Sequence, residues 1–391
     1  MIHPQQLVDD YIQGARDFRR ASLAQIALQK AQLSGIVLSG ADLSGACLAM
    51  TDLSHAQLLN VVLNEANLRQ ADLSDANLSR SVLLNVILWR AQLQRAKLGG
   101  CRMGGSLLQG ADLTDADLSH ANLNGCQLQG ANLSRANLSG ADLSHADLRE
   151  ANLWCADLGG STLKNCDLRG ATLEQAHWGG VFLDRETQLD PKWRLVWELV
   201  NWDGEARDLT SIDLSHAHLE RVNLRGATLT GANLSWANLS GSHLVGATLR
   251  GADLTHTCLE QANLQGADLS EARLLGANLI GATLDHVALQ RTRINGETRW
   301  DPKWHLVWHL LNKPNLEWSL PHVDLSNAYL WRAPLRSAVL RGASLRGADL
   351  READLSDADL RQVDFRGANL RGTILAGCQM EGSLFDEETQ L

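Results

Sequence analysis

The chain has 391 residues, of which 45% are hydrophobic but only 5% aromatic, and its formal net charge is −10. The apolar content is therefore nearly all Leu and Ala, which is typical of a repeat rather than of a mixed core. No stretch approaches about 18 uninterrupted apolar residues, and the first residues show neither a basic nor an apolar leader segment. We therefore expect a cytoplasmic protein with no membrane association.

The first 15 residues predict one short helix that caps the start of the fold. Pro4 is suited to the first helical position, and Leu7, Val8, Tyr11 and Ile12 fall on one side of a helix that ends near residue 13. A glycine follows, as at many helix ends.

Residues 16–183 repeat with a period of five. Leu recurs at every fifth position from Leu23 to Leu173, with Met103 as the one exception, and a small residue, usually Ala, stands two positions earlier. Asp or Asn commonly stands directly before the Leu, as in Ala111-Asp112-Leu113. The same pattern resumes in two later runs, so that Leu fills 59 of 66 central positions.

A period of five fits neither a helix nor a strand. Five helical residues rotate by roughly 500°, and five extended residues reverse the face, so the chain must turn within every repeat. In a short extended side, the central Leu and the Ala two positions earlier point the same way, which predicts that both face inward. Small polar residues then lie outside or at the corners.

The pattern Ala-(Asp/Asn)-Leu-x-x over this length resembles the pentapeptide-repeat family. The resemblance implies an all-β solenoid, a right-handed quadrilateral β-helix with four pentapeptides per coil. Periodicity alone predicts a turning solenoid but not the number four.

With four repeats per coil, six apolar residues of the first run gather on two adjacent outer sides where polar residues are usual. They form a candidate protein-interaction patch: Val62, Val82, Leu84, Ile87, Trp89 and Leu107. The alternative is that this apolar surface has no partner or is covered by another part of the chain.

Two excursions interrupt the repeat at residues 184–206 and 295–318. They are near copies, E-T-x-x-D-P-K-W-x-L-V-W-x-L-x-N, in which Asp-Pro is a helix-start signal. Each predicts an amphipathic helix with an aromatic stripe, which contains Trp193 and Trp197 in the first copy and Trp304 and Trp308 in the second. The stripes either cover the end of a repeat run or serve as partner-docking faces.

The resulting organisation has an N-terminal helix, three repeat runs separated by two helical inserts, and a tail. The segments are 1–15, 16–183, 184–206, 207–294, 295–318, 319–385 and 386–391. The tail repeats the start of an insert without its helix. Because terminal coils mediate dimers in the family, the resemblance implies a homodimer through the C-terminal coil as one hypothesis.

We find no motif for catalysis, cofactors or metals. The His residues are scattered, and none forms a metal-ligand set with Cys. Cys101, Cys126, Cys166 and Cys378 stand where Ala is usual and are expected to be small interior residues. An enzyme is therefore not expected, and neither is a bound cofactor.

The family resemblance also suggests DNA mimicry, in which an acidic β-helix occupies the DNA-binding surface of gyrase, a type II topoisomerase. The N-terminal helix and the three repeat runs together carry a net charge of only −4, and the Asp residues of the runs alternate with Arg. Duplex DNA carries about one charge per 1.7 Å, far more than this surface. We therefore expect a non-enzymatic protein-interaction scaffold with an unidentified protein partner and no direct nucleic-acid binding, with the gyrase-binding DNA mimic as the alternative.

Overall fold

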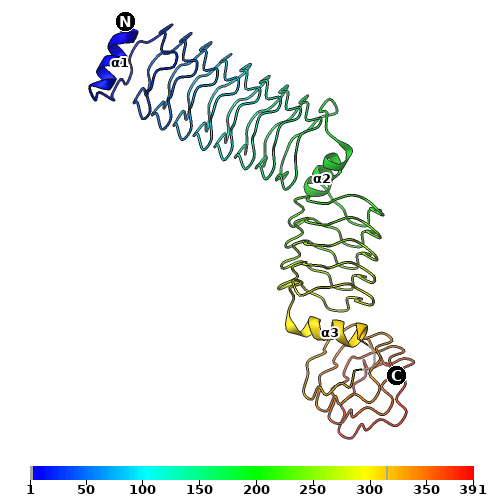
Figure 1. The fold of residues 1–391 in the computed structure, drawn as a ribbon. Helices are drawn as coiled ribbons and strands as arrows, with labels where there is room; N and C mark the ends of the chain where they lie inside the picture. Colours follow the sequence, from blue (N-terminus) through cyan, green and yellow to red (C-terminus); the bar gives the residue numbers. More distant parts are fainter. Residues whose placement is uncertain (1–2, 314–315) are drawn as a thin grey trace. The chain divides into compact units, whose positions relative to one another are not determined.

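The computed structural model describes residues 3–313 and 316–391. Its helices are α1 (Pro4–Ile12), α2 (Pro191–Asn201) and α3 (Pro302–Asn312), and five-residue repeats form nearly all of the remainder. The chain divides into two compact units, Met1–Asn201 and Trp202–Leu391. In the first unit α2 lies at the end of the coiled repeats, and in the second α3 separates two sets of coils (Figure 1).

Successive coils pair through parallel bridges between residues 20 positions apart, such as Asp17 with Val37 and Val37 with Gln57. Four pentapeptides therefore make one coil, as the family resemblance implied. At a typical side, Leu23 N donates to Asp42 O at 2.7 Å and Asp42 N donates to Ala21 O at 3.0 Å. Within each run, successive coils are thus joined by regular backbone hydrogen bonds on all four sides.

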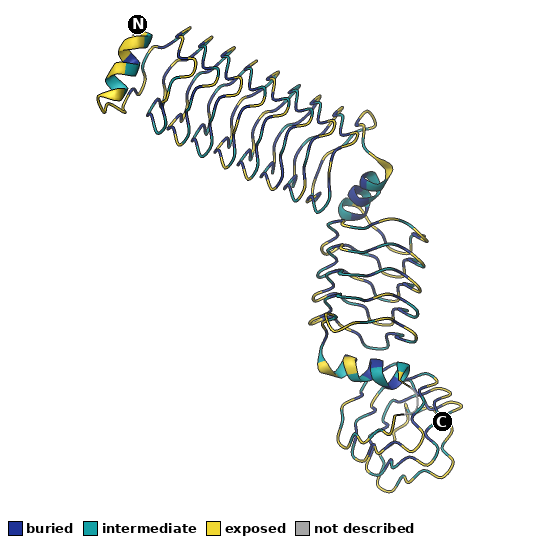
Figure 2. Cartoon of the chain, in the orientation of Figure 1, coloured by how far each residue is buried: buried dark blue, intermediate teal, exposed yellow. Residues whose placement is uncertain are grey.

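The central Leu and the preceding small residue fill the interior, as predicted from the period. Ala111 is 0% and Leu113 1% exposed, and Figure 2 shows buried residues following the inner line of the coils. At several positions where Ser, Thr or Cys replaces the small residue, its side chain donates to the carbonyl of a central residue in the coil below, whereas the Ser161 hydroxyl has no hydrogen-bond partner among the described residues. Ser106 Oγ donates to Leu83 O at 2.6 Å, and Cys101 Sγ to Leu78 O at 2.9 Å.

The corners are tight turns. The backbone N–H three residues after most central residues donates to the central carbonyl, as Ala21 N does to Phe18 O. The second residue after the centre has φ near +60°, the conformation required at the third position of a type II turn. Gly is favoured there, and the non-Gly residues with positive φ include no Val, Ile or Thr in the described part of the chain.

This corner conformation predicts a specific cost for a β-branched side chain. Gly125 has φ +67°, and an added Cβ would meet no atom within 4 Å, so only backbone strain opposes substitution. Gly125→Val should destabilise the coil by about 1–2 kcal/mol, whereas Gly125→Asn should cost about half a kcal/mol or less. Denaturant unfolding of both variants measures the difference, and equal costs would contradict this account.

Helix α1 covers the first coil. Its residue Leu7 is 0% exposed, and Tyr11 Oη donates to Ser34 O at 2.7 Å. The prediction that Ile12 shares the buried side is wrong, because Ile12 is 74% exposed at the C-terminal end of the helix. Ile12 follows Leu7 by five residues, which places it about 140° around the helix from Leu7.

The bridges continue past each repeat run with one extra residue. Gln188, Arg299 and Gln390 pair with residues 21 positions earlier instead of 20. The first residues of each insert and the tail therefore complete a coil before the chain departs from it.

Candidate functional site

The coil brings the six apolar residues of the first run together as two groups on neighbouring sides. Val62 bridges Val82, and Ile87 bridges Leu107, so each pair is stacked on successive coils. Leu107 is 36% exposed, and the other five residues are half-buried.

One group surrounds Trp89. The guanidinium carbon of Arg69 lies 4.3 Å from the centre of the Trp89 ring, and that of Arg90 lies 4.4 Å from it. This is the geometry of a double cation–π contact. A surface hollow of about 510 Å³ lies here, lined by Arg69, Ile87, Trp89, Leu107 and Gln109. In the part of the chain that the structure describes, neither Arg69 nor Arg90 has a carboxylate partner.

The side of the coil that carries Trp89 is free of acidic residues over six successive coils. We call it the Trp89 strip, and it comprises residues 27–30, 47–50, 67–70, 87–90, 107–110 and 127–130. Its charged residues are Lys30, Arg69 and Arg90, and its exposed apolar residues include Met50, which is 48% exposed. Asp147 begins the next coil on this side, so the acid-free surface ends there.

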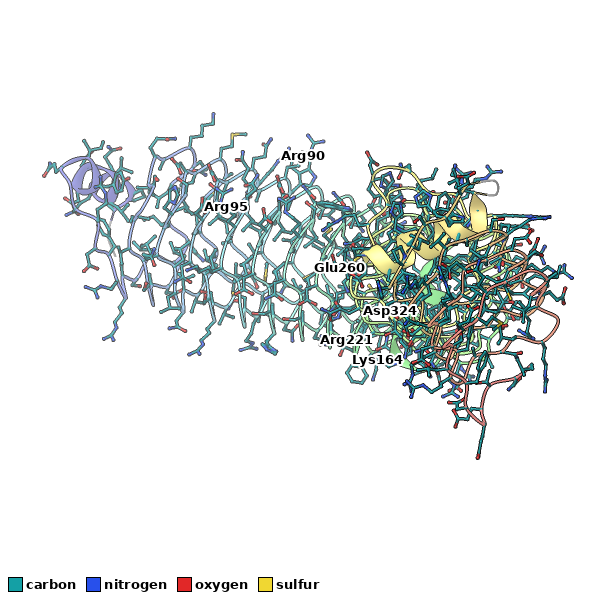
Figure 3. The ribbon with its side chains drawn as sticks, turned by 90° about the horizontal axis from the view of Figure 1, so that it is seen from below. Arg90, Arg95, Lys164, Arg221, Glu260 and Asp324 are labelled. Atoms are coloured by element: carbon teal, nitrogen blue, oxygen red, sulfur yellow. The ribbon has the colours of Figure 1, made fainter. Side chains whose placement is uncertain are left out.

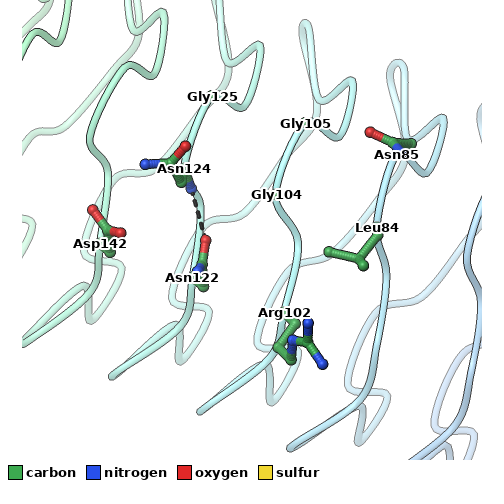
Figure 4. Close-up of a pocket in the computed structure, with 9 residues that line it drawn as sticks. All are labelled: Leu84, Asn85, Arg102, Gly104, Gly105, Asn122, Asn124, Gly125 and Asp142. Carbon is green, nitrogen blue, oxygen red and sulfur yellow. Dashed lines mark hydrogen bonds between the residues drawn. The ribbon is translucent and has the colours of Figure 1, made fainter.

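The other group contains Leu84 and lies in different surroundings. Leu84 borders a hollow of about 500 Å³ whose remaining lining is polar or glycine, including Arg102, Asn122 and Asp142 (Figure 4). Asn124 N donates to Asn122 Oδ1 at 3.1 Å on its floor. This hollow offers little apolar surface for a protein partner, whereas the Trp89 strip combines apolar and cationic groups.

The four insert Trp residues lie against the ends of repeat runs. Trp193, Trp197, Trp304 and Trp308 are 6–8% exposed. Trp197 Nε1 donates to Val181 O at 2.8 Å, and Trp308 Nε1 donates to Thr292 Oγ1 at 2.8 Å. Each helix thus uses its aromatic stripe to cover the last coil before it.

Each insert helix ends in an Asn that binds the coil below. Asn201 Nδ2 donates to Trp178 O at 2.9 Å, and Gly180 N donates to Asn201 Oδ1 at 2.6 Å. In α3, Asn312 repeats both contacts, with Leu289 O and Arg291 N. The helical spacing of the inserts predicts the Trp stripe but not this amide contact, for which the final Asn shared by the two copies is the signal in the sequence.

The charged residues at ladder and corner positions are extensively paired. Arg95 Nη2 lies 2.6 Å from Asp75 Oδ2 in the coil below, and Arg361 Nη2 lies 2.7 Å from Asp359 Oδ2, two residues earlier in the chain. Figure 3 shows Arg90 and Arg95 on the outside of the first unit, where Arg95 is paired and Arg90 stacks on Trp89. The outer Asp residues therefore do not form a continuous negative surface.

The sequence profile described as pentapeptide repeats matches the chain over most of its length. The matched segments are 17–54, 51–85, 87–125, 126–165, 208–244, 229–266, 257–296, 320–357 and 348–386. The chain belongs to the pentapeptide-repeat family. Curated proteins provide no match to it.

Solved pentapeptide-repeat structures resemble the chain. HetL of the cyanobacterium Nostoc, a protein involved in the regulation of heterocyst differentiation, is 29% identical over 76% of this chain and 100% of its own, with a TM-score of 0.22. The Nostoc protein alr5209 is 38% identical over 25% of this chain and 76% of its own, with a TM-score of 0.19. QnrB1, a plasmid-mediated fluoroquinolone resistance protein, is 13% identical over 64% of this chain and 90% of its own, with a TM-score of 0.18. The likeness to QnrB1 concerns the fold alone.

No group of His, Cys, Asp and Glu suited to a metal ion occurs among residues 3–313 and 316–391. Within the same residues, no helix is long and apolar enough to cross a membrane. Burial raises the pKa of the Cys101 and Cys126 thiols to about 12, so these two groups stay protonated and are poor nucleophiles.

The Asp–Arg pairs of this pentapeptide-repeat protein predict its behaviour in acid. Hydrogen bonds from Arg361 lower the pKa of Asp359 from 3.8 to about 2, and Arg366 and Arg149 lower the pKa of Asp364 and Asp147. A carboxyl group whose pKa is lower in the folded state contributes stability above about pH 4, and this is lost as the pH falls towards 2. The thermal midpoint should therefore be level from pH 7 to about 5 and fall between pH 4 and 2. A steep fall between pH 7 and 5 would contradict this assignment.

Proposed function

We propose that this pentapeptide-repeat protein is a non-enzymatic scaffold that binds an acidic, partly apolar segment of a partner protein on the Trp89 strip. The observation that carries the proposal is the contact of the Trp89 ring with both Arg69 and Arg90 on a surface with no acidic residue over six coils. Ile87 and Leu107 add apolar area beside it.

The chemistry of these groups defines the partner. A guanidinium group that stacks on an aromatic ring keeps N–H donors in its plane, which suit a carboxylate. Trp and Arg are also the residue types that contribute most often to interface hot spots. A partner segment with Asp or Glu beside an aromatic or aliphatic residue would pair with Arg69 or Arg90 and pack against Trp89.

The rest of the surface disfavours the alternative of a gyrase-binding DNA mimic. Such a mimic needs a dense run of unpaired acidic groups, whereas many outer Asp residues here bind Arg within the same or the adjacent coil. The net charge of −10 likewise disfavours direct binding of nucleic acid.

Selection from a random peptide library displayed on phage tests the proposal. The full chain, when immobilised, should enrich peptides with Asp or Glu close to an aromatic or aliphatic residue, and added salt should weaken their binding. Trp89→Ala should reduce binding at least about tenfold, as expected for an interface hot spot. The control Trp154→Ala removes another outward Trp, 42% exposed, and should leave binding unchanged. Enriched peptides that bind both variants equally, or that are basic, would overturn the proposal.

A further inference from the structure

The second and third repeat runs contact each other directly beside α3, which lies between them in the second unit (Figure 1). His286 N donates to Asn327 O at 2.8 Å, and Gln290 Nε2 donates to Trp331 O at 3.5 Å. One side of the second run thereby continues into the third run, although the chain passes through α3 between them.

A hollow of about 300 Å³ lies at this contact. Ala288 accounts for the space, because it occupies the outward ladder position directly before the central Leu289 and pairs with Asp268 of the previous coil. Most ladder positions of this run carry Asp, Asn or Thr, so a methyl group there leaves room above the backbone. The lining also includes Ser270, Tyr329 and Trp331.

Three oxygen atoms in the lining are free to accept hydrogen bonds. Ser270 N donates to Asp268 Oδ1 at 2.8 Å, but no described residue donates to Asp268 Oδ2. The hydroxyl groups of Ser270 and Tyr329 likewise have no hydrogen-bond partner within the described part of the chain. The hollow therefore combines a carboxylate with two hydroxyl groups that the rest of the unit does not use.

Asp268 is the unbalanced charge of the hollow. The other formally charged lining residue, Arg250, is neutralised by Glu271, whose Oε1 lies 2.9 Å from Arg250 Nη2. Asp268 has no ion-pair partner among the residues that the structure describes. In this it differs from the many outer Asp residues that bind Arg.

The surroundings of Tyr329 have the same sign. Burial raises the pKa of its hydroxyl, and the carboxylates of Asp349 and Asp268 raise it further, whereas Arg351 opposes them. Arg351 Nη2 lies 2.6 Å from Asp349 Oδ2, so the carboxylate of Asp268 is the uncompensated charge near this ring. Such a charge favours a cation in the hollow.

Two aromatic rings supply the apolar part of the lining. Tyr329 and Trp331 are half-buried. The guanidinium carbon of Arg332 lies 4.2 Å from the centre of the Trp331 ring, and Arg332 pairs with Glu352, which holds the indole in place. Ring surface beside a carboxylate suits an alkylammonium ion, because the rings attract its charge and pack against its chain.

We propose that this hollow binds a small organic cation that carries a primary ammonium group on a short apolar chain. The ammonium group has three N–H donors, and Asp268 Oδ2, Tyr329 Oη and Ser270 Oγ are the three acceptors. The chain packs against Tyr329 and Trp331 in the space that Ala288 leaves. This site is separate from the Trp89 strip and stands whether or not the strip binds a partner.

Isothermal titration calorimetry of the intact chain with putrescine tests the site. We expect one site per chain and at least about tenfold weaker binding of the butanediol of the same chain length, because the diol lacks the charge. Asp268→Asn should weaken putrescine binding at least about tenfold, and Ala288→Gln, which fills the hollow, should abolish it. Asn and Gln are native at other ladder positions, such as Asn278 and Gln92, so both variants are compatible with the fold.

The matched control is Asp253→Asn, which removes a ladder carboxylate outside the hollow and should leave putrescine binding unchanged. The absence of saturable binding in the millimolar range would overturn the proposal. Equal binding of the diol would overturn the assignment of a cation, and unchanged binding by Asp268→Asn would overturn the assignment of this hollow. Tighter binding of N-acetyl-lysine amide than of putrescine would show that a protein side chain, and not a small molecule, is the occupant.

Discussion

Replacement of Trp178 by Ala should be among the most damaging single changes in the first unit. Its side chain is 0% exposed at the centre of the last coil, and its carbonyl accepts from Asn201 of α2. Removing a buried Trp side chain leaves a large cavity and typically costs about 3–5 kcal/mol. In the full chain carrying Trp178→Ala, backbone hydrogen exchange in the coil that contains residue 178 should be faster by the factor that corresponds to this loss of free energy.

The matched variant Trp178→Phe separates packing from polarity. The Trp178 indole N–H is buried and has no hydrogen-bond partner among the residues that the structure describes, and leaving such a donor unpaired costs about 1–3 kcal/mol. Phe keeps most of the side-chain volume and removes this donor, so the free energy of unfolding should change by no more than about 1 kcal/mol. Leu289 fills the equivalent position beneath α3, which supports an apolar requirement there. If Phe proved as costly as Ala, the indole would have a role that this packing does not explain.

The second large effect should come from Asn201→Ala. The Asn201 amide donates to Trp178 O and Trp197 O and accepts from Gly180 N. Its loss leaves Trp178 O with Val181 N as its remaining donor and removes the acceptor of the exposed Gly180 N–H. The expected cost is about 1–3 kcal/mol, seen as local opening of α2 in hydrogen exchange rather than as loss of the whole fold.

Asn312→Ala repeats this test at α3, because the Asn312 amide makes the equivalent contacts there. It should open α3 to a similar extent. As a control, Trp202→Ala removes a 72% exposed side chain just after α2 and should change stability by about 0.5 kcal/mol or less. Unchanged exchange in α2 upon Asn201→Ala would show that the Trp stripe alone holds the helix.

The period of five determined much of the architecture in advance. It requires a turn in every repeat, which places Leu and the preceding Ala inside and polar residues at the corners, and this is what the structure shows. The number of repeats per coil depends on the backbone angle at each corner, which the composition of Ser, Gly, Arg and Asp does not specify. Only the family resemblance supplied it.

Side-chain contacts between neighbouring coils could not be predicted from the sequence. Arg69 and Trp89 are 20 residues apart, so their stacking becomes visible only after the coil register is known. The same holds for Ser106, whose hydroxyl lies between Leu83 O and Val86 N of the coil below. The extra residue in the coil that ends each run could not be predicted either. It follows the last central residue and therefore leaves the hydrophobic period before it unchanged.

The most direct test of the proposed scaffold is comparative affinity capture from a lysate of the source cells. The bait proteins are the unmodified chain, the double variant Ile87→Asp with Trp89→Asp, and the control Asn77→Asp with Ser79→Asp, which adds two charges half a coil away. We predict a protein that the unmodified chain and the control capture equally and that the Ile87/Trp89 variant captures at least about tenfold less, as loss of a hot spot implies. Equal capture by all three, or capture of gyrase with inhibition of its supercoiling, would contradict the assignment of the Trp89 strip as the functional surface.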